Sequence, residues 1–98
     1  MKRTEILEAA ERCVCGDREQ DYGSPEDSFR CIAALWNAYY EGKGLTFPGG
    51  LFKSVDVAAM LALLKIARIA SCHAKEDNWV DLAGYAACGG EIETEART

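Results

Sequence analysis

The sequence of 98 residues has little of what several protein classes require. It contains one histidine and two prolines, and its 11 Lys and Arg are outnumbered by 16 Asp and Glu. The formal charge of −5 argues against a protein that binds a DNA or RNA backbone, because such proteins carry a basic face. Met1-Lys2-Arg3 is followed by polar and acidic residues, so we predict no signal peptide and a cytoplasmic protein.

Common catalytic motifs are also absent. The sequence has no Walker loop, GxGxxG, HExxH, paired CxxC or nucleophile elbow, which excludes the enzyme classes that depend on them. The five cysteines are an odd number without framework spacing, as is typical of a reducing compartment. His73 follows Cys72, but a zinc site or a catalytic Cys–His pair there is the less favoured interpretation.

The sequence does have one long apolar stretch, Ser54–Ser71. Its apolar residues leave no fully polar helix face, which predicts a central helix that is buried on most sides. Asp56, Lys65 and Arg68 interrupt it, so a membrane-spanning helix is disfavoured. A single domain of this size buries such a helix more easily when copies associate. We therefore expect a homo-oligomer that associates through apolar helix faces.

Three more helices are predicted from apolar stripes and their end signals. Residues 2–15 form the first, and Gly16 ends it. Ser24 and Pro25 are typical of a helix start, so residues 25–41 form the second helix, whose apolar stripe consists of Phe29, Ile32, Ala33, Trp36 and Tyr40. A long loop precedes the central helix, which Ser54 caps.

The last helix is expected to begin with Asp77 as its cap and to fray after Gly90, which leaves a polar tail at 91–98. Its predicted core stripe consists of Trp79, Leu82, Ala83 and Ala86. No alternating strand pattern occurs. The sequence therefore predicts a single all-α domain over residues 1–98, a four-helix bundle.

Lys65 and Arg68 lie about 60° apart on one face of the central helix, so together they could hold a phosphate. A structural alternative is equally favoured, in which they form a buried ion-pair network with Asp21, Asp77 or Asp81. The two interpretations are compatible, because an ion pair can open to admit a ligand.

Asp77 and Asp81 are one helical turn apart, a spacing that allows two carboxylates to hold Mg²⁺. From the spacing alone we favour a structural interpretation, in which Asp77 caps the helix and Asp81 pairs with a cation of the central helix. Gly84 allows another helix or a ligand to approach closely. Tyr22 and Tyr85 are the aromatic residues that we expect to contact a base.

Three blocks of the sequence, taken together, resemble a known family. They are Asp21-Tyr22-Gly23, Asp56 with Lys65 and Arg68 in DVAAMLALLKIAR, and Asp77 with Asp81 and Tyr85 in DNWVDLAGYAA. Their order over roughly residues 18–91 resembles small phage and prophage proteins of the nucleotide-modification-associated type, which in turn are similar to MazG-like all-α NTP pyrophosphohydrolases. The resemblance implies an oligomeric α-helical bundle with nucleotide sites between helices, often between subunits.

In MazG-like enzymes an EExxE motif and an acidic pair on the next helix bind Mg²⁺, which activates water to attack a phosphoanhydride. Only the acidic pair carries over to this chain, as Asp77 and Asp81. The helix expected to carry EExxE has Asp56, apolar residues, and then Lys65 and Arg68. Loss of the metal-binding carboxylates disfavours hydrolysis, and the cations favour direct phosphate binding.

The resulting hypothesis is a phage-type protein that binds or sequesters a nucleotide or a nucleotide-derived signal in the host cytoplasm, as in counter-defence. Its ligand-binding residues would be Lys65, Arg68, Tyr22, Tyr85 and Asp21. The first alternative is a Mg²⁺-dependent nucleoside triphosphate pyrophosphohydrolase with the metal ligands Asp77, Asp81 and Asp56. The second is a non-enzymatic oligomeric interaction protein, whose buried charges only set helix register.

Overall fold

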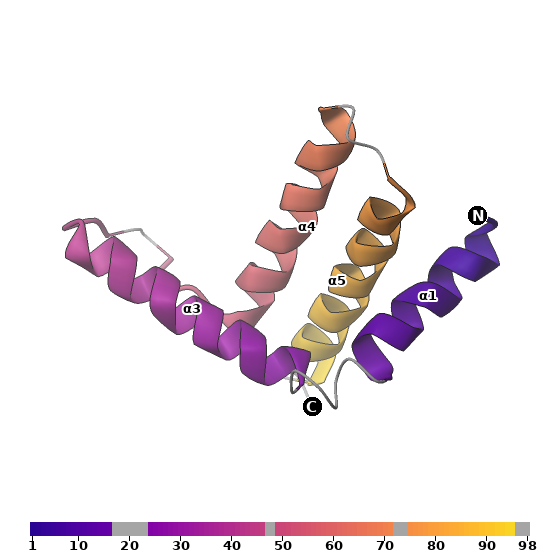
Figure 1. Cartoon of the computed structure of the whole chain (residues 1–98). Helices are drawn as coiled ribbons and strands as arrows, with labels where there is room; N and C mark the ends of the chain where they lie inside the picture. The colour runs from indigo at the N-terminus through magenta and orange to yellow at the C-terminus, as the bar shows by residue number, and fades with distance from the viewer. Residues whose placement is uncertain (17–23, 47–48, 72–74, 96–98) are drawn as a thin grey trace.

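The computed structural model describes residues 1–16, 24–46, 49–71 and 75–95. In these ranges the chain forms four α-helices (Figure 1), which are α1 (Arg3–Cys15), α3 (Pro25–Gly42), α4 (Ser54–Ala70) and α5 (Glu76–Glu95). No strand occurs among the described residues, so the all-α prediction is confirmed for them.

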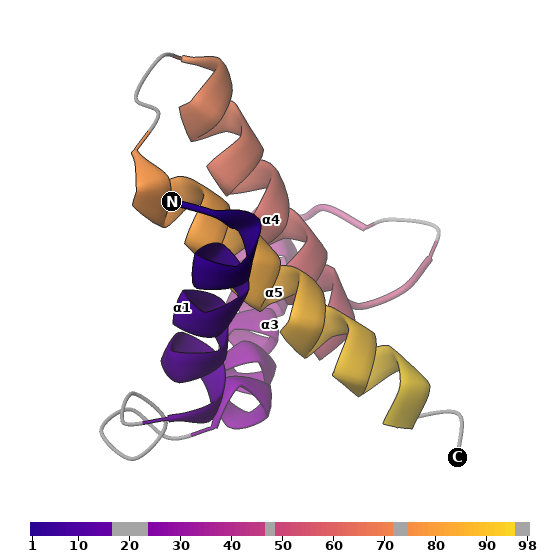
Figure 2. The ribbon, with the colours of Figure 1, turned by 90° about the vertical axis from the view of Figure 1, so that its right-hand side faces the viewer.

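The helices are arranged around α5. It lies alongside α4, packs against α1 on another side and also contacts α3 (Figures 1 and 2). Helix α3 packs against α4 near the start of α4, and the two helices then diverge, so that they form a V in Figure 1. The helix that packs most extensively against the others is therefore α5, whereas the sequence indicated α4.

Only one side of α4 is buried within a single chain. Val57 and Ala58 are buried, whereas four large apolar residues of this helix are exposed, namely Met60, Leu63, Leu64 and Ile66. The buried central helix expected from the sequence is thus not formed by one chain alone. Within the described residues, no helix has the length and apolar character of a membrane-spanning segment.

The hydrophobic core lies where α3, α4 and α5 meet. Its buried side chains are those of Phe29, Ala33, Val57, Ala58 and Cys88. Phe29 and Ala33 belong to the apolar stripe predicted for residues 25–41, and Ile32 and Trp36 of the same stripe pack against the core. The inward face of α3 is therefore the one that its 3.6-residue periodicity predicts.

The loop before α4 is fastened to α3 by Phe52 and Asn37. The ring of Phe52 packs edge-on against Trp36 and Tyr40, with 5.7 Å between ring centroids in each pair. The Asn37 amide nitrogen donates to the Phe52 carbonyl oxygen at 3.1 Å, and Asn37 Oδ1 accepts from the Phe52 backbone N–H at 2.8 Å. These contacts fix the start of α4 against α3.

Side-chain hydrogen bonds cap the starts of α3 and α4, and the cap residue of α4 differs by one position from the predicted one. Ser24 Oγ accepts a hydrogen bond from the Asp27 backbone N–H at 3.2 Å, which confirms the predicted cap of α3. In α4, Ser54 is the first helical residue and Lys53 takes the cap position. Asp56 Oδ2 accepts from the Lys53 backbone N–H at 2.8 Å, so the predicted cap at Ser54 is wrong by one residue.

Helix α5 continues where the sequence predicts an end, through Gly89 and Gly90 to Glu95. A Cβ atom added to Gly89 would lie 3.1 Å from Cβ of Ala58, so the glycine lets α4 and α5 approach closely. Ile92, one turn further on, packs against the core. The predicted fraying after Gly90 is therefore wrong, because packing against α4 and the core stabilises this end of the helix.

The inward side of α5 also differs from the predicted stripe. The buried residues are Asn78, Val80, Gly84 and Cys88, whereas Trp79 is 49% exposed. Asp77 is the second residue of the helix and not its cap. The stripe was misassigned because α5 has apolar residues on several sides, so their spacing does not select one face.

The two adjacent glycines of α5 offer a matched test of the close approach between α4 and α5. Gly89→Leu would press against Ala58, and overpacking of this kind costs about 1–3 kcal/mol. Gly90 is exposed and a Cβ added there would face open space, so Gly90→Leu is expected to be neutral or stabilising through helix propensity. Urea unfolding followed by circular dichroism compares the two variants, and equal midpoints would contradict the contact.

Candidate functional site

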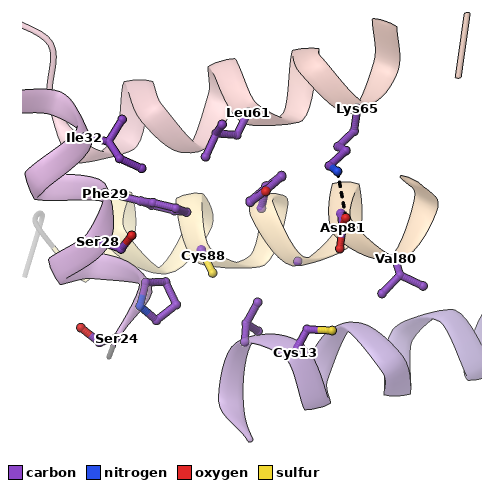
Figure 3. Close-up of a pocket in the computed structure, with 14 residues that line it drawn as sticks. Cys13, Ser24, Ser28, Phe29, Ile32, Leu61, Lys65, Val80, Asp81 and Cys88 are labelled. Atoms are coloured by element: carbon purple, nitrogen blue, oxygen red, sulfur yellow. Dashed lines mark ion pairs between the residues drawn. The ribbon is translucent and has the colours of Figure 1, made fainter. Parts of the chain in front are cut away.

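A pocket of about 420 Å³ opens where α1, α3, α4 and α5 converge (Figure 3). Figure 3 shows Phe29 and Ile32 of α3, Leu61 of α4 and Cys13 of α1 around it. Its walls are mainly apolar, with few charged or hydroxyl groups. This volume and this lining are typical of small-molecule sites.

One ion pair lies within this largely apolar pocket. Lys65 Nζ of α4 is 2.9 Å from Asp81 Oδ2 of α5 (Figure 3, dashed line). Their side chains are only 14% and 27% exposed, so both charges are partly removed from water. Each charge offsets the desolvation cost of the other. The structure thus contains the pairing that the sequence offered as the alternative to phosphate binding.

Helical spacing brings both charged residues to the pocket. Lys65 follows Leu61 by one turn and Ala58 by two, so it continues the inward side of α4. Asp81 precedes Gly84 by one turn and Cys88 by two, which places it on the inward side of α5. Because α4 and α5 lie alongside each other, these two sides meet.

An aromatic wall is formed by Phe29 and Tyr85. Their ring centroids are 6.2 Å apart with an interplanar angle of 53°, and both residues line the pocket. Next to Tyr85, a Cβ atom added to Gly84 would lie 3.2 Å from Val14 Cγ1 of α1. Of the two uses predicted for Gly84, the structure therefore shows the close approach of another helix.

The start of α3 supplies two hydroxyl groups that are not among the predicted ligand-binding residues. Ser24 and Ser28 both line the pocket, next to Phe29 (Figure 3). Ser24 was recognised only as a helix cap. Their spacing of four residues, which places two hydroxyl groups on one side of a helix end, is the signal that could have identified them.

Several predicted ligand-binding residues are not in this pocket. Arg68 is exposed in the last turn of α4 and is not among the lining residues. Asp21 and Tyr22 lie outside the described residues, as do Cys72 and His73. Of the predicted set, Lys65 and Tyr85 are therefore the residues that the structure brings together.

The predicted metal ligands are dispersed among different local roles. Asp56 accepts the capping hydrogen bond at the start of α4, Asp77 is exposed in the first turn of α5, and Asp81 pairs with Lys65. Across the described ranges, no group of three or more His, Cys, Asp or Glu side chains is placed to hold a metal ion. A Mg²⁺ site at these three residues stays a prediction.

The chain is similar to proteins of two mycobacteriophages. A family model described as "Domain of unknown function (DUF6378)" matches residues 5–93. The chain is 37% identical over 90 residues to the Gene 55 protein of Mycobacterium phage D29, and 43% identical over 81 residues to that of phage L5. These alignments cover 92% and 83% of this chain but 54% and 47% of the relatives, so it spans about half their length. No solved structure matches it.

Proposed function

This chain belongs to the DUF6378 family of phage proteins, and on that premise we propose that it binds a nucleotide or a nucleotide-derived small molecule in the pocket between its four helices. One observation carries the proposal, namely that a largely buried lysine and an aromatic wall share one pocket. Lys65 supplies positive charge for a phosphate. Phe29 and Tyr85 supply ring surface for a base.

An anionic ligand must compete with Asp81 for Lys65. A phosphate group offers more negative charge than a carboxylate and three oxygen acceptors, so it can replace Asp81 as the partner of the ammonium group. Asp81 is the more exposed member of the pair, at 27% against 14%, and can turn toward water when the phosphate enters. The hydroxyl groups of Ser24 and Ser28 offer further hydrogen bonds to the ligand.

The lining of the pocket favours binding over hydrolysis. Release of pyrophosphate by a metal-dependent enzyme requires several carboxylates around the metal. Among the described residues, Asp81 is the one carboxylate that lines the pocket, and it is paired with Lys65. The proposal includes a likeness to MazG-like proteins. It also includes a counter-defence role, in which the protein sequesters a nucleotide signal.

A homo-oligomer is also part of the proposal. One chain leaves the large apolar residues of α4 exposed to water, which is unfavourable for a surface of that extent. Association of copies would bury this surface and produce the buried central helix that the sequence favours.

Native mass spectrometry tests nucleotide binding directly. The purified protein is mixed with nucleoside triphosphates, cyclic mono- and dinucleotides and ADP-ribose derivatives, each with and without Mg²⁺. We expect a mass increase equal to one intact nucleotide per site, without a requirement for Mg²⁺. Absence of binding across the whole panel would contradict the proposal.

Asp81→Asn separates binding from hydrolysis, because the two functions predict opposite effects. For a binding protein, removal of the competing carboxylate charge is expected to tighten nucleotide affinity by up to about tenfold, or about 1.4 kcal/mol. For a pyrophosphohydrolase, the same change would abolish a Mg²⁺-dependent release of pyrophosphate. Calorimetry and a pyrophosphate assay on wild type and variant distinguish the two outcomes.

A further inference from the structure

From Ala59 onward, helix α4 exposes a face on which every residue is apolar. Six residues, here called the outer face, are exposed on the side of α4 that faces away from Val57, Ala58 and Leu61, and they are Ala59, Met60, Leu63, Ile66, Ala67 and Ala70. Helix α4 therefore presents apolar residues to water as well as to the core.

Continuity distinguishes the outer face from ordinary exposed residues. Leu63 is 61% exposed, and its helical neighbours three and four positions away are all apolar and exposed, namely Ala59, Met60, Ile66 and Ala67. Leu7 of α1 is 62% exposed, but its helical neighbours include Arg3, Thr4 and Glu11. A single exposed leucine such as Leu7 is normal, whereas a contiguous apolar patch marks an interaction surface.

The order of side-chain sizes on the outer face is the same from either end. Around Leu63 the order is small, large, large, large, small, in the residues Ala59, Met60, Leu63, Ile66 and Ala67. If two antiparallel copies of α4 were related by a two-fold axis at Leu63, Ala59 would share a layer with Ala67 of the partner helix and Met60 with Ile66. The alanines allow close approach at both ends, and the larger side chains fill the middle.

The absence of charge on the outer face permits a second copy of this chain as the partner. The chain has a formal charge of −5, so two copies repel each other wherever acidic surfaces meet. In a two-fold contact a residue near the axis meets its own equivalent, so any carboxylate there would face a like charge. None of the six residues of the outer face carries a charge, and Asp56, on the same side of α4, lies two turns from Leu63 and so away from the axis.

We propose that the outer face of α4 is the surface through which two copies of this chain associate, with the α4 helices antiparallel and a two-fold axis at Leu63. Leu61 and Lys65, which line the pocket, lie on the opposite side of α4 and stay outside this contact. This inference rests on the homo-oligomer of the proposed function and names its interface, but it does not depend on any ligand.

Leu63→Glu tests the interface by placing a carboxylate at the axis. We expect wild type to have twice the chain mass of 10.7 kDa in size-exclusion chromatography with light scattering, and Leu63→Glu to have half the wild-type value. Leu63 is exposed in the single chain, so the helix content measured by circular dichroism should not change. Leu7→Glu makes the same change at a matched exposure and should retain the dimer.

Three results would overturn the assignment of the interface. They are a monomeric wild type at all concentrations, a Leu63→Glu protein that associates like wild type, and equal dissociation by Leu7→Glu. Nucleotide titration of the Leu63→Glu monomer separates this inference from the proposed function. A wild-type dimer that binds no nucleotide contradicts the proposed function alone, and a wild-type monomer that binds nucleotide contradicts the dimer alone.

Oxidative cross-linking tests the orientation of the two helices. The exposed Cys15 and Cys31 are first replaced by serine to reduce background linkage. In an antiparallel pair Leu63→Cys lies beside its own equivalent and should cross-link, whereas Ala59→Cys lies beside residue 67 and should not. Peptide mapping identifies the linked positions, and equally efficient linkage at residue 59 would overturn the antiparallel arrangement.

Discussion

Lys65→Met is expected to raise the dissociation constant of the bound nucleotide by about 10- to 100-fold. Lys65 is the charged donor in the pocket, and hydrogen bonds to charged groups contribute about 1.5–3 kcal/mol. Each 1.4 kcal/mol corresponds to a factor of ten in affinity. Isothermal titration calorimetry with the nucleotide that native mass spectrometry selects provides the measurement.

Two variants control for charge and location. Lys65→Arg keeps the positive charge and should retain most of the affinity, although its planar donor group differs in geometry. Lys43→Met removes an exposed lysine after α3, outside the pocket, and should have no effect. Unchanged affinity in Lys65→Met would place the phosphate elsewhere. Arg68, exposed at the end of α4, would then be the next residue to test.

Local signals in the sequence were sufficient to predict the helices. The start of α3 depends on Ser24 and Pro25, whose preferences are local and do not depend on the rest of the fold. The end of α5 could not be predicted in this way, because Gly89 acts through its contact with Ala58 of another helix. A glycine that ends a helix and one that admits a neighbouring helix look the same in a sequence.

The rotation of each helix about its axis explains which site residues were predicted correctly. Lys65 and Arg68 were grouped because about 60° separates them, yet Lys65 pairs with Asp81 in the pocket while Arg68 is exposed. Which of two neighbouring cations faces α5 is decided by the packing of the core. The apolar character of α4 was evident from the sequence, but a pattern of apolar residues does not distinguish burial within a chain from burial between chains.

Phe29→Ala is expected to lower the free energy of unfolding by about 3–5 kcal/mol, the usual cost of truncating a buried phenylalanine. Phe29 is 6% exposed, belongs to the core and packs against the ring of Tyr85. Small domains are stable by only about 5–15 kcal/mol, so this loss is a large part of the total. Urea unfolding of the variant, followed by circular dichroism, measures it.

Tyr39→Ala is the matched control for Phe29→Ala, since Tyr39 is an aromatic residue of the same helix that is 69% exposed. We expect its free energy of unfolding to change by no more than about 0.5 kcal/mol. Equal losses in the two variants would contradict the placement of the core on the Phe29 side of α3.

Phe29 belongs to the core and also lines the pocket, so its variants test whether the ring contacts the ligand as well as stabilising the fold. Phe29→Leu keeps most of the buried volume and is expected to remain folded. If a base lies against the aromatic wall, Phe29→Leu should weaken nucleotide binding while Lys65 is intact, because stacking on an aromatic ring contributes about 1–3 kcal/mol. If affinity is unchanged, the role of Phe29 is confined to the core, and Tyr85 becomes the ring to examine in the same way.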